Sequence, residues 1–338
     1  MGDENRLKAI DLFAGIGGIR LGFEDANGGG VDTVFASEWD EWAQKTYKAN
    51  FKDPFPIAGD ITKVDERDIP PFDICLAGFP CQAFSIAGKR QGFSDDYYGQ
   101  SRGTLFAEVV RICEYHKPKL IFCENVKGLV RHDGGKTLKV IVGAFEQIGY
   151  RVFWHVLNSK DFGVPQNRER VYLVCFRNDV APDEFEFPSS VGKKRVIRDI
   201  LQDAPIPSKY YLSDTYLASL RAHKARHASK GHGFGYEIRD LDDVAGAIVV
   251  GGMGRERNLL VDHREHSKVP TTNIKGNLND EDIRKMTPRE WARLQGFPDS
   301  YELPLADTHS YKQLGNSVTV PVIRAIANVA LGVVRDVN

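Results

Sequence analysis

The sequence predicts an α/β fold: a doubly wound, mostly parallel β-sheet with a second, smaller and irregular domain. Three observations support this prediction. Short β-rich runs alternate with helical periodicities through the first half of the chain, the alternation fades after about residue 180, and residues 190–285 carry weak, short signals with many glycines. Alternating strands and helices are typical of a parallel sheet with helices on both faces.

Five β-rich runs are the expected strands. Between them, apolar residues recur at helical spacing in three groups that begin at Ile19, Leu105 and Leu138. The runs, in chain order, are KAIDLFA (8–14), TVFASE (33–38), FDICLAG (72–78), KLIFCEN (119–125) and RVYLVCF (170–176).

Two helices are expected near the C-terminus. In TPREWARLQGF, Thr287 is the predicted N-cap, Pro288 the first helical residue, Glu290 the partner in a capping box and Gly296 the stop. The run VPVIRAIANVALGVV is interrupted by Arg324, which favours a buried helix over a membrane span.

Composition indicates an ordinary globular protein. A chain of 338 residues suggests about two domains, and its 42% hydrophobic and 27% charged residues are typical of folded proteins. The acidic, polar N-terminus does not resemble a signal peptide. Five cysteines without a CxxC pair indicate a reducing compartment and argue against a disulfide framework or a zinc site.

A glycine-bearing turn, DLFAGIGG (11–18), follows the first expected strand. In a doubly wound sheet this turn lies at the carboxyl edge, where glycines let a ligand approach the backbone. The third glycine of a dinucleotide fingerprint would fall at Arg20, so another nucleoside ligand is favoured. Glu38, at the end of the second strand, is placed to hold ribose hydroxyls, and Asp60 in AGDIT, at the next expected strand end, to accept from an adenine amino group.

The same edge collects groups for covalent chemistry. Cys81 follows the run 72–78, Glu124 closes KLIFCENV, and Arg168 and Arg170 precede the last strand. Together they offer a nucleophile, an acid and a cationic clamp. Separately, a core cysteine, a helix cap and a surface ion pair would explain them. The chain has no serine elbow and no histidine at a matching strand end, which argues against a Cys/His hydrolase.

Nine motifs in order make the sequence resemble the DNA (cytosine-5) methyltransferases, especially the compact bacterial enzymes of restriction–modification systems. They cover about residues 10–180 and 284–325. The motifs are DLFAGIGGIRLGFE, SEWD, GDIT, GFPCQAFSIAGKRQGF, SRGTLF, ENVKGL, QNRERVYLV, RKMTPREWARLQGFPDSY and QLGNSVTVPV.

The resemblance implies a Rossmann-like S-adenosylmethionine-dependent methyltransferase fold and a covalent mechanism. Cys81 would attack C6 of a flipped-out cytosine, so that C5 takes the methyl group. Glu124 would hold the N3/N4 edge and donate a proton at N3, Arg170 would contact O2, and Arg168 would support the same region.

The resemblance also implies that S-adenosyl-L-methionine is the cofactor and S-adenosyl-L-homocysteine its product. The implied cofactor-binding residues are Phe13, Ile16, Gly18, Glu38, Trp39, Asp60, Ile61, Gly78, Pro80, Leu105, Asn316 and Val318. Because the last motif returns to the cofactor, the expected catalytic domain is discontinuous, 1–187 with 309–338. Residues 188–308 would form the target-recognition domain and hinge.

Residues 82–100 are expected to form a lid over the flipped base, and 231–239 and 247–258 two recognition loops. Arginines in such loops contact either guanines or phosphates, and both readings stay open. The Thr-Leu pair of many relatives is absent from the second loop, and Ile248-Val249 replaces it. The expected DNA-binding residues are Gln82, Ser85, Lys89, Arg90, Phe234, Tyr236, Arg255 and Arg257.

Between Val191 and Lys230 there are nine Lys/Arg against three Asp/Glu, which fits either a solvated basic face or a phosphate-contacting surface. The expected partners are double-stranded DNA with a short cytosine-bearing site and a separate cognate restriction endonuclease. We expect a monomer in the bacterial cytosol, associated with the nucleoid and not with a membrane.

Three other functions would use parts of the same pattern. An RNA methyltransferase of the same family would carry a Cys-Phe-Thr insert, which the sequence lacks. A catalytically inactive relative would lack Cys81 or Glu124. A nicotinamide-dependent oxidoreductase is disfavoured by the incomplete glycine fingerprint.

Overall fold

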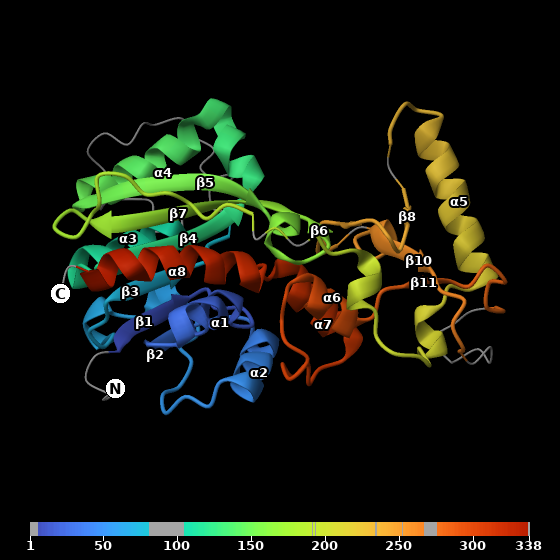
Figure 1. Cartoon of the computed structure of the whole chain (residues 1–338), viewed down its shortest axis with the longest axis horizontal. Helices are drawn as coiled ribbons and strands as arrows, with labels where there is room; N and C mark the ends of the chain where they lie inside the picture. Colours follow the sequence, from blue (N-terminus) through green and yellow to red (C-terminus); the bar gives the residue numbers. More distant parts are fainter. Residues whose placement is uncertain are drawn as a thin grey trace. The chain divides into compact units, whose positions relative to one another are not determined.

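The computed structural model describes residues 6–80, 105–190, 192, 194–233, 235–251, 253–266 and 276–336 (Figure 1). The chain forms two compact units. The first comprises Met1–Asn158, Glu169–Ser190 and Val320–Asn338, and the second Ser159–Arg168 and Val191–Thr319.

The first unit is built on a six-stranded sheet in the order β2-β1-β3-β4-β7-β5. Strands β2, β1, β3 and β4 pair in parallel, whereas β7 is antiparallel to both of its neighbours. The predicted mostly parallel, doubly wound sheet is therefore confirmed. The strands are β1 (Leu7–Leu12), β2 (Val31–Ser37), β3 (Ile74–Ala77), β4 (Leu120–Val126), β5 (Tyr150–Asn158) and β7 (Glu169–Arg177).

Strand β5 is not among the five runs expected from the sequence. It lies at the edge of the sheet, and most of its side chains are half-buried or exposed. Its sequence, YRVFWHVLN, is rich in β-branched and aromatic residues, so a strand signal is present that the five predicted runs left out.

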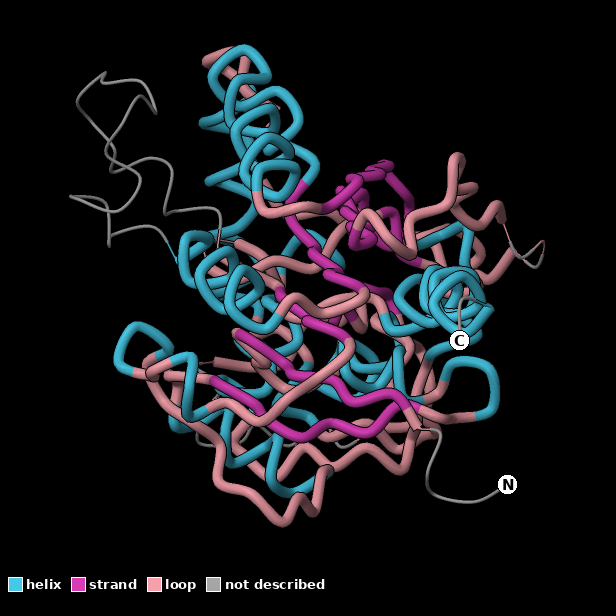
Figure 2. The backbone as a smooth tube through the Cα atoms, turned by 90° about the vertical axis from the view of Figure 1, so that its left-hand side faces the viewer, coloured by secondary structure: helices cyan, strands magenta, loops and turns pink. Residues whose placement is uncertain are grey.

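Helices cover both faces of the sheet (Figure 2). Val109 of α3 and Ile141 of α4 join the core that Ile10, Cys75 and Ile121 form on one face. On the opposite face, Phe23 of α1 meets Phe122 edge-on, with ring centroids 5.1 Å apart. The helices of this unit are α1 (Gly18–Glu24), α2 (Glu41–Asn50), α3 (Leu105–His116), α4 (Lys136–Gln147) and α8 (Val320–Asp336).

Helix α8 is the expected buried C-terminal helix. Ile323, Ile326 and Leu331 are fully buried, and Ile323 lies directly against Gly22 of α1. Among the described residues, one helical stretch, Asp307–Arg335, is long and apolar enough to span a membrane, but much of its apolar surface is buried inside the protein. This stretch includes α8, and burial of this kind is typical of a core helix.

The second unit has short, irregular elements. Its strands are β6 (Gln166–Asn167), β8 (Ile238–Arg239), β9 (Ala245–Gly246), β10 (Leu259–Val261) and β11 (Ile283–Lys285), arranged as β11-β10-β8 and β6-β9. Its helices are α5 (Asp214–Ala228), α6 (Pro288–Leu294) and α7 (Asp307–Asn316).

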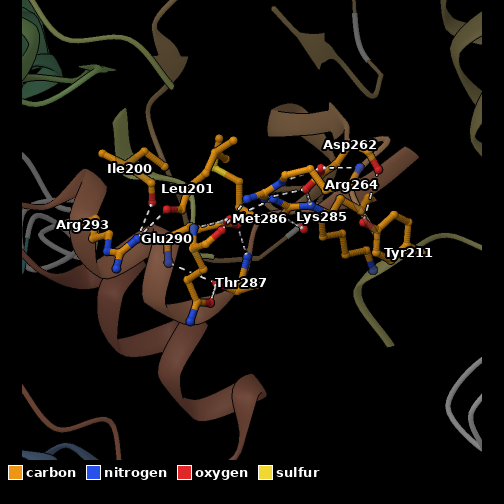
Figure 3. Close-up of polar contacts among 12 residues, drawn as sticks. Ile200, Leu201, Tyr211, Asp262, Arg264, Lys285, Met286, Thr287, Glu290 and Arg293 are labelled. Carbon is orange, nitrogen blue, oxygen red and sulfur yellow. Dashed lines mark hydrogen bonds and ion pairs between the residues drawn. The ribbon is translucent and has the colours of Figure 1, made fainter. Parts of the chain in front are cut away.

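Helix α6 begins as the sequence predicts. The Thr287 side chain accepts from the Glu290 N–H, and the Glu290 carboxylate accepts from the Thr287 N–H at 2.8 Å, which completes the capping box. Glu290 also accepts two hydrogen bonds of 2.8 Å from the buried Arg284. Arg284 bonds in turn to Asp262. Arg264 donates to both oxygens of the Asp262 carboxylate (Figure 3). These charges tie α6, β11 and the segment after β10 together.

Candidate active site

The parallel strands finish at a common edge of the sheet. Leu12, the last residue of β1, pairs with Ser37 and Ala77, the last residues of β2 and β3. Phe13, Glu38 and Gly78 therefore follow three neighbouring strands at the same level. This edge is where doubly wound sheets bind their ligands.

The predicted acid and clamp meet at this edge. Strand β7 starts here because it is antiparallel to β4, and Arg170 pairs with Val126 in the register. The Arg170 Nε lies 3.2 Å from the Glu124 Oε1, and both side chains are largely buried. A carboxyl group and a guanidinium this close together can form hydrogen bonds to neighbouring polar atoms of one flat ring.

Asn125 is a positioning group that the sequence analysis missed. It is buried, and its Nδ2 donates to the Phe79 carbonyl oxygen at 2.9 Å. This bond holds the segment that leads to Cys81. A side chain that bonds to a backbone carbonyl 46 residues away leaves no signal in one sequence.

Glu38 organises the glycine turn. One carboxylate oxygen accepts the Gly15 N–H at 2.8 Å and the other accepts the Asp40 N–H at 2.8 Å. Burial raises the pKa of Glu38, and these two backbone bonds oppose that shift. Each oxygen keeps a further lone pair, so the carboxylate remains able to accept hydroxyl donors.

The surroundings fit a nucleoside-bearing cofactor. Gly15 has a φ of +55°, and a Cβ there would meet nothing within 4 Å, so the turn leaves open space. Trp39 is 82% exposed, which makes its indole available to a flat ring. Ile16 and Ile61 are buried, whereas Pro80 is exposed. Gly18 is buried at the start of α1, and Leu105 packs on the core at the start of α3.

Asp60 differs from its expected setting. It does not close a strand of the sheet, because only an isolated bridge between Ser37 and Ala58 precedes it. Instead, Asp60 caps a short 3₁₀ turn and accepts from the Thr62 N–H and hydroxyl. These bonds lower the pKa of Asp60, which keeps it ionised and able to accept.

Several predicted residues lie elsewhere. Cys81, Gln82, Ser85, Lys89, Arg90 and Phe234 are outside the described residues. Arg168, Asn316 and Val318 belong to the second unit. There, Arg168 is 3% exposed and donates to the carbonyl oxygens of Ile248 and Ser317 at 2.7 and 2.6 Å.

The expected recognition loops also lie in the second unit. Arg255 is exposed and lies over the ring of Tyr311, 5.4 Å from its centroid. Glu256, beside it, is buried and accepts from the Tyr216 hydroxyl at 2.9 Å. The loop is thus anchored at Glu256.

Arg257 and Tyr236 are half-buried. The Arg257 carbonyl accepts from the Arg239 Nε, and the Tyr236 carbonyl accepts from the Lys224 Nζ. Both residues are therefore linked to neighbouring segments through their backbones.

Comparison with known proteins identifies the family of the chain. The sequence model of the C-5 cytosine-specific DNA methylases matches residues 7–331. The chain belongs to this family. The methyltransferase uses S-adenosyl-L-methionine as methyl donor and methylates C5 of cytosine in DNA.

Curated relatives extend over nearly the whole methyltransferase. The type II methyltransferase M.HpaII of Haemophilus parainfluenzae is 56% identical over 321 residues, which cover 94% of this chain and 87% of that protein. M.SsoII of Shigella sonnei is 43% identical, covering 96% of this chain and 80% of that protein.

Solved structures share the fold. The Dnmt2 methyltransferase of S. pombe superimposes with a TM-score of 0.73 at 22% identity, covering 97% of this chain and 99% of that one. The Entamoeba histolytica methyltransferase EhMeth gives 0.73 at 20% identity, covering 97% and 99%.

Proposed function

We propose that this enzyme is the modification methyltransferase of a type II restriction–modification system, and that Cys81 is its nucleophile. The relatives at 56% and 43% identity are type II methyltransferases. In this proposal the substrate is a short cytosine-bearing site in double-stranded DNA, and a separate endonuclease is the cognate partner. The enzyme acts as a monomer in the cytosol.

The other cysteines support Cys81 as the nucleophile. Cys75, Cys113, Cys123 and Cys175 are free and fully buried. Burial raises the pKa of Cys113, Cys123 and Cys175 well above the usual range, which suppresses the reactive thiolate. Four of the five cysteines therefore serve the core, and Cys81 is the one left for chemistry.

The single observation that carries the mechanism is the Glu124–Arg170 pair at the edge where the segment before Cys81 is held. Attack of the Cys81 thiolate on C6 forms a carbon–sulfur bond and pushes electrons toward N3. Glu124 donates a proton at N3, so charge does not accumulate on the ring, and Arg170 holds O2. C5 would then take the methyl group that S-adenosyl-L-methionine supplies, and the N3 proton would return to Glu124. Loss of the C5 proton to a solvent base would expel the Cys81 thiolate and restore the aromatic ring.

The cofactor site is proposed at the neighbouring strand ends. Glu38 would hold the ribose, Asp60 the adenine amino group, and Phe13, Trp39 and Ile61 the flat rings. S-adenosyl-L-methionine, when bound, supplies an electrophilic methyl group and leaves as S-adenosyl-L-homocysteine. Asn316, the last residue of α7, and Val318 are also proposed to bind the cofactor.

The second unit is proposed to read the DNA sequence. Arg255 is exposed on an anchored loop, as a group that contacts bases or phosphates must be. The proposed target-recognition domain and hinge span residues 188–308, and residues 1–187 with 309–338 form the catalytic domain. Exchanging residues 225–275 for those of a relative should change the methylated sequence but leave the chemistry intact.

Trapping tests the nucleophile. Duplex DNA carrying 5-fluorocytosine at the target, identified first by bisulfite sequencing of DNA from cells that express the enzyme, should give a denaturant-resistant conjugate with methyl donor present. Cys81→Ala should give none, while retaining DNA binding in a mobility-shift assay. Methyl transfer by Cys81→Ala, or a conjugate formed with transfer RNA and not with duplex DNA, would exclude the proposal.

A further inference from the structure

Arg168 is buried in the second unit at the end of the short strand β6. Its Nη1 donates to the Ile248 carbonyl oxygen at 2.7 Å, and its Nη2 donates to those of Ser317 and Gly315 at 2.6 and 3.3 Å. One guanidinium thus joins two segments that lie 80 and about 150 residues further along the chain. A planar fork with fixed donors is suited to such a task, whereas an ammonium is a point charge.

The same two segments are joined by buried amides. The Gln166 Oε1 accepts the Ile248 N–H at 3.0 Å, and its Nε2 donates to the Leu294 carbonyl at 2.9 Å. The Gln295 Nε2 donates to the Leu314 carbonyl oxygen at 3.0 Å. Gln166 of β6 is therefore bonded directly to the segment at Ile248 and to α6, and Gln295, the C-cap of α6, is bonded to α7.

Close packing joins the segments a second time. A Cβ at Gly315 would lie 2.8 Å from the Val250 Cγ2 and 3.1 Å from the Val250 backbone nitrogen. Real Cβ atoms do not approach other atoms so closely, so the segment after Ile248 rests directly on the backbone at Gly315. Any side chain at position 315 would separate them.

We propose that Arg168 is a positioning residue that fixes the start of the second recognition loop to the C-terminal end of helix α7, which carries Asn316. The inference rests on the proposed roles of residues 247–258 and Asn316. In the sequence analysis Arg168 was expected to support the region around the cytosine O2. The carbonyl oxygens of Ile248, Gly315 and Ser317 instead assign its guanidinium to the backbone of the recognition unit.

The assignment has a kinetic consequence. If Arg168 holds these segments, its loss loosens both the loop proposed to read DNA and the end of α7, where Asn316 is proposed to bind the cofactor. Both KM values should then rise, while kcat at saturation falls less. A residue acting on the pyrimidine ring would instead lower kcat and spare the KM values.

The test uses Arg168→Ala and Arg168→Lys in the full-length enzyme. Arg151→Ala is the control, because Arg151 is an exposed arginine of the first unit that pairs with Asp183 and lies outside the proposed DNA and cofactor sites. We expect Arg168→Ala to raise KM for DNA and for S-adenosyl-L-methionine about tenfold or more, since buried carbonyls lose charged donors. Arg168→Lys should recover part of this loss, and Arg151→Ala should match the wild type.

Hydrogen exchange supplies a readout independent of activity. The Ile248 amide, which donates to Gln166, should exchange faster in Arg168→Lys, as should the amides of residues 313–318. Amides of helix α5 should be unchanged. If Arg168→Ala fails to fold, the kinetics and exchange of Arg168→Lys decide.

Two results would overturn the inference. The first is wild-type hydrogen exchange and wild-type KM values for DNA and S-adenosyl-L-methionine in Arg168→Lys. The second is loss of the 5-fluorocytosine conjugate at saturating DNA in an Arg168 variant whose two KM values are unchanged. The second result would return Arg168 to the pyrimidine site. If Cys81 were not the nucleophile, or if replacing residues 225–275 did not change the methylated sequence, the hydrogen-exchange result for Arg168→Lys would still stand. Failure of the proposed function is therefore distinguishable from failure of this inference.

Discussion

The Arg170 Nε lies 3.2 Å from the Glu124 Oε1, across two neighbouring antiparallel strands of the central sheet. The sheet itself sets this pair, since Arg170 opposes Val126 in the register, two residues from Glu124. Both side chains are largely buried, so solvent screens their interaction only weakly. The pair is thus built before any substrate arrives, as electrostatic preorganisation requires.

Replacing Glu124 by Gln should slow formation of the covalent adduct. Gln keeps the size of the side chain but cannot donate an acidic proton at N3, and such general-acid help is worth ~10²–10⁴-fold. Single-turnover trapping with 5-fluorocytosine DNA measures the rate. Affinity for S-adenosyl-L-methionine should stay unchanged, because the proposed ribose ligand, Glu38, follows a different strand from the one that carries Glu124.

The matched control is Glu169→Gln. Glu169 is the next residue to Arg170 but forms an exposed pair with Lys127. Its substitution should leave the adduct rate within about twofold, as expected for an exposed ion pair. A Glu124→Gln enzyme that forms adduct at the wild-type rate would remove Glu124 from the chemistry.

Glu38→Gln should weaken cofactor binding. The carboxylate accepts backbone N–H groups from Gly15 and Asp40, and an amide would turn one donor toward another. We expect the dissociation constant of S-adenosyl-L-methionine to rise by about tenfold or more, since charge-assisted bonds are lost. Isothermal titration measures it, with the exposed Glu41→Gln as control. Equal affinities in the two variants would contradict a ribose role for Glu38.

The sequence was informative wherever a strand ends at the site. Glu124 could be located because it follows the apolar run Leu120–Cys123 of β4, and Glu38 because it follows β2, which carries a shorter apolar run. Strand β5 carries a comparable signal, since Val152, Phe153 and Trp154 are typical strand residues, so it could also have been predicted. Asp60 was assigned to a strand end, yet an isolated bridge and a capped turn hold it.

Hydrogen-bond partners that lie far apart in the chain could not be predicted from the sequence. Asn125 bonds to Phe79, and Arg168 to Ile248, through backbone carbonyl oxygens. Every residue has a backbone carbonyl, so the amino-acid type of the partner does not reveal that it accepts such a bond. Predicting such bonds requires the tertiary fold, which a single sequence does not contain.

Asp11→Asn should change how stability depends on pH. Asp11 is fully buried in β1, and burial raises its pKa to about 8. Between the unfolded value near 4 and the folded value, the folded state binds more protons than the unfolded state. Stability from this group is therefore full below about pH 4 and is lost as pH rises toward 8.

The measurement is the melting temperature of both proteins between pH 5 and pH 9. Asn does not titrate, so the melting temperature of Asp11→Asn minus that of the wild type should rise with pH and level off above about pH 8. Asp25→Asn is the control, because Asp25 is exposed. A difference that stays constant over this range would show that Asp11 does not hold a proton in the folded state.

Two helical glycines should respond to alanine in opposite ways. A Cβ at Gly22 in α1 would lie 2.6 Å from the Ile323 Cβ and 3.1 Å from the Arg324 nitrogen, so α8 would have to move. A Cβ at Gly143 in α4 would meet nothing within 4 Å. Gly22→Ala should therefore destabilise by about 1–3 kcal/mol through overpacking. Gly143→Ala should stabilise by about 0.5–1 kcal/mol, because alanine loses less conformational entropy in a helix. Urea unfolding of the two variants measures both signs. Stabilisation by Gly22→Ala would mean that α1 and α8 are not in the close contact that joins the C-terminal helix to the sheet.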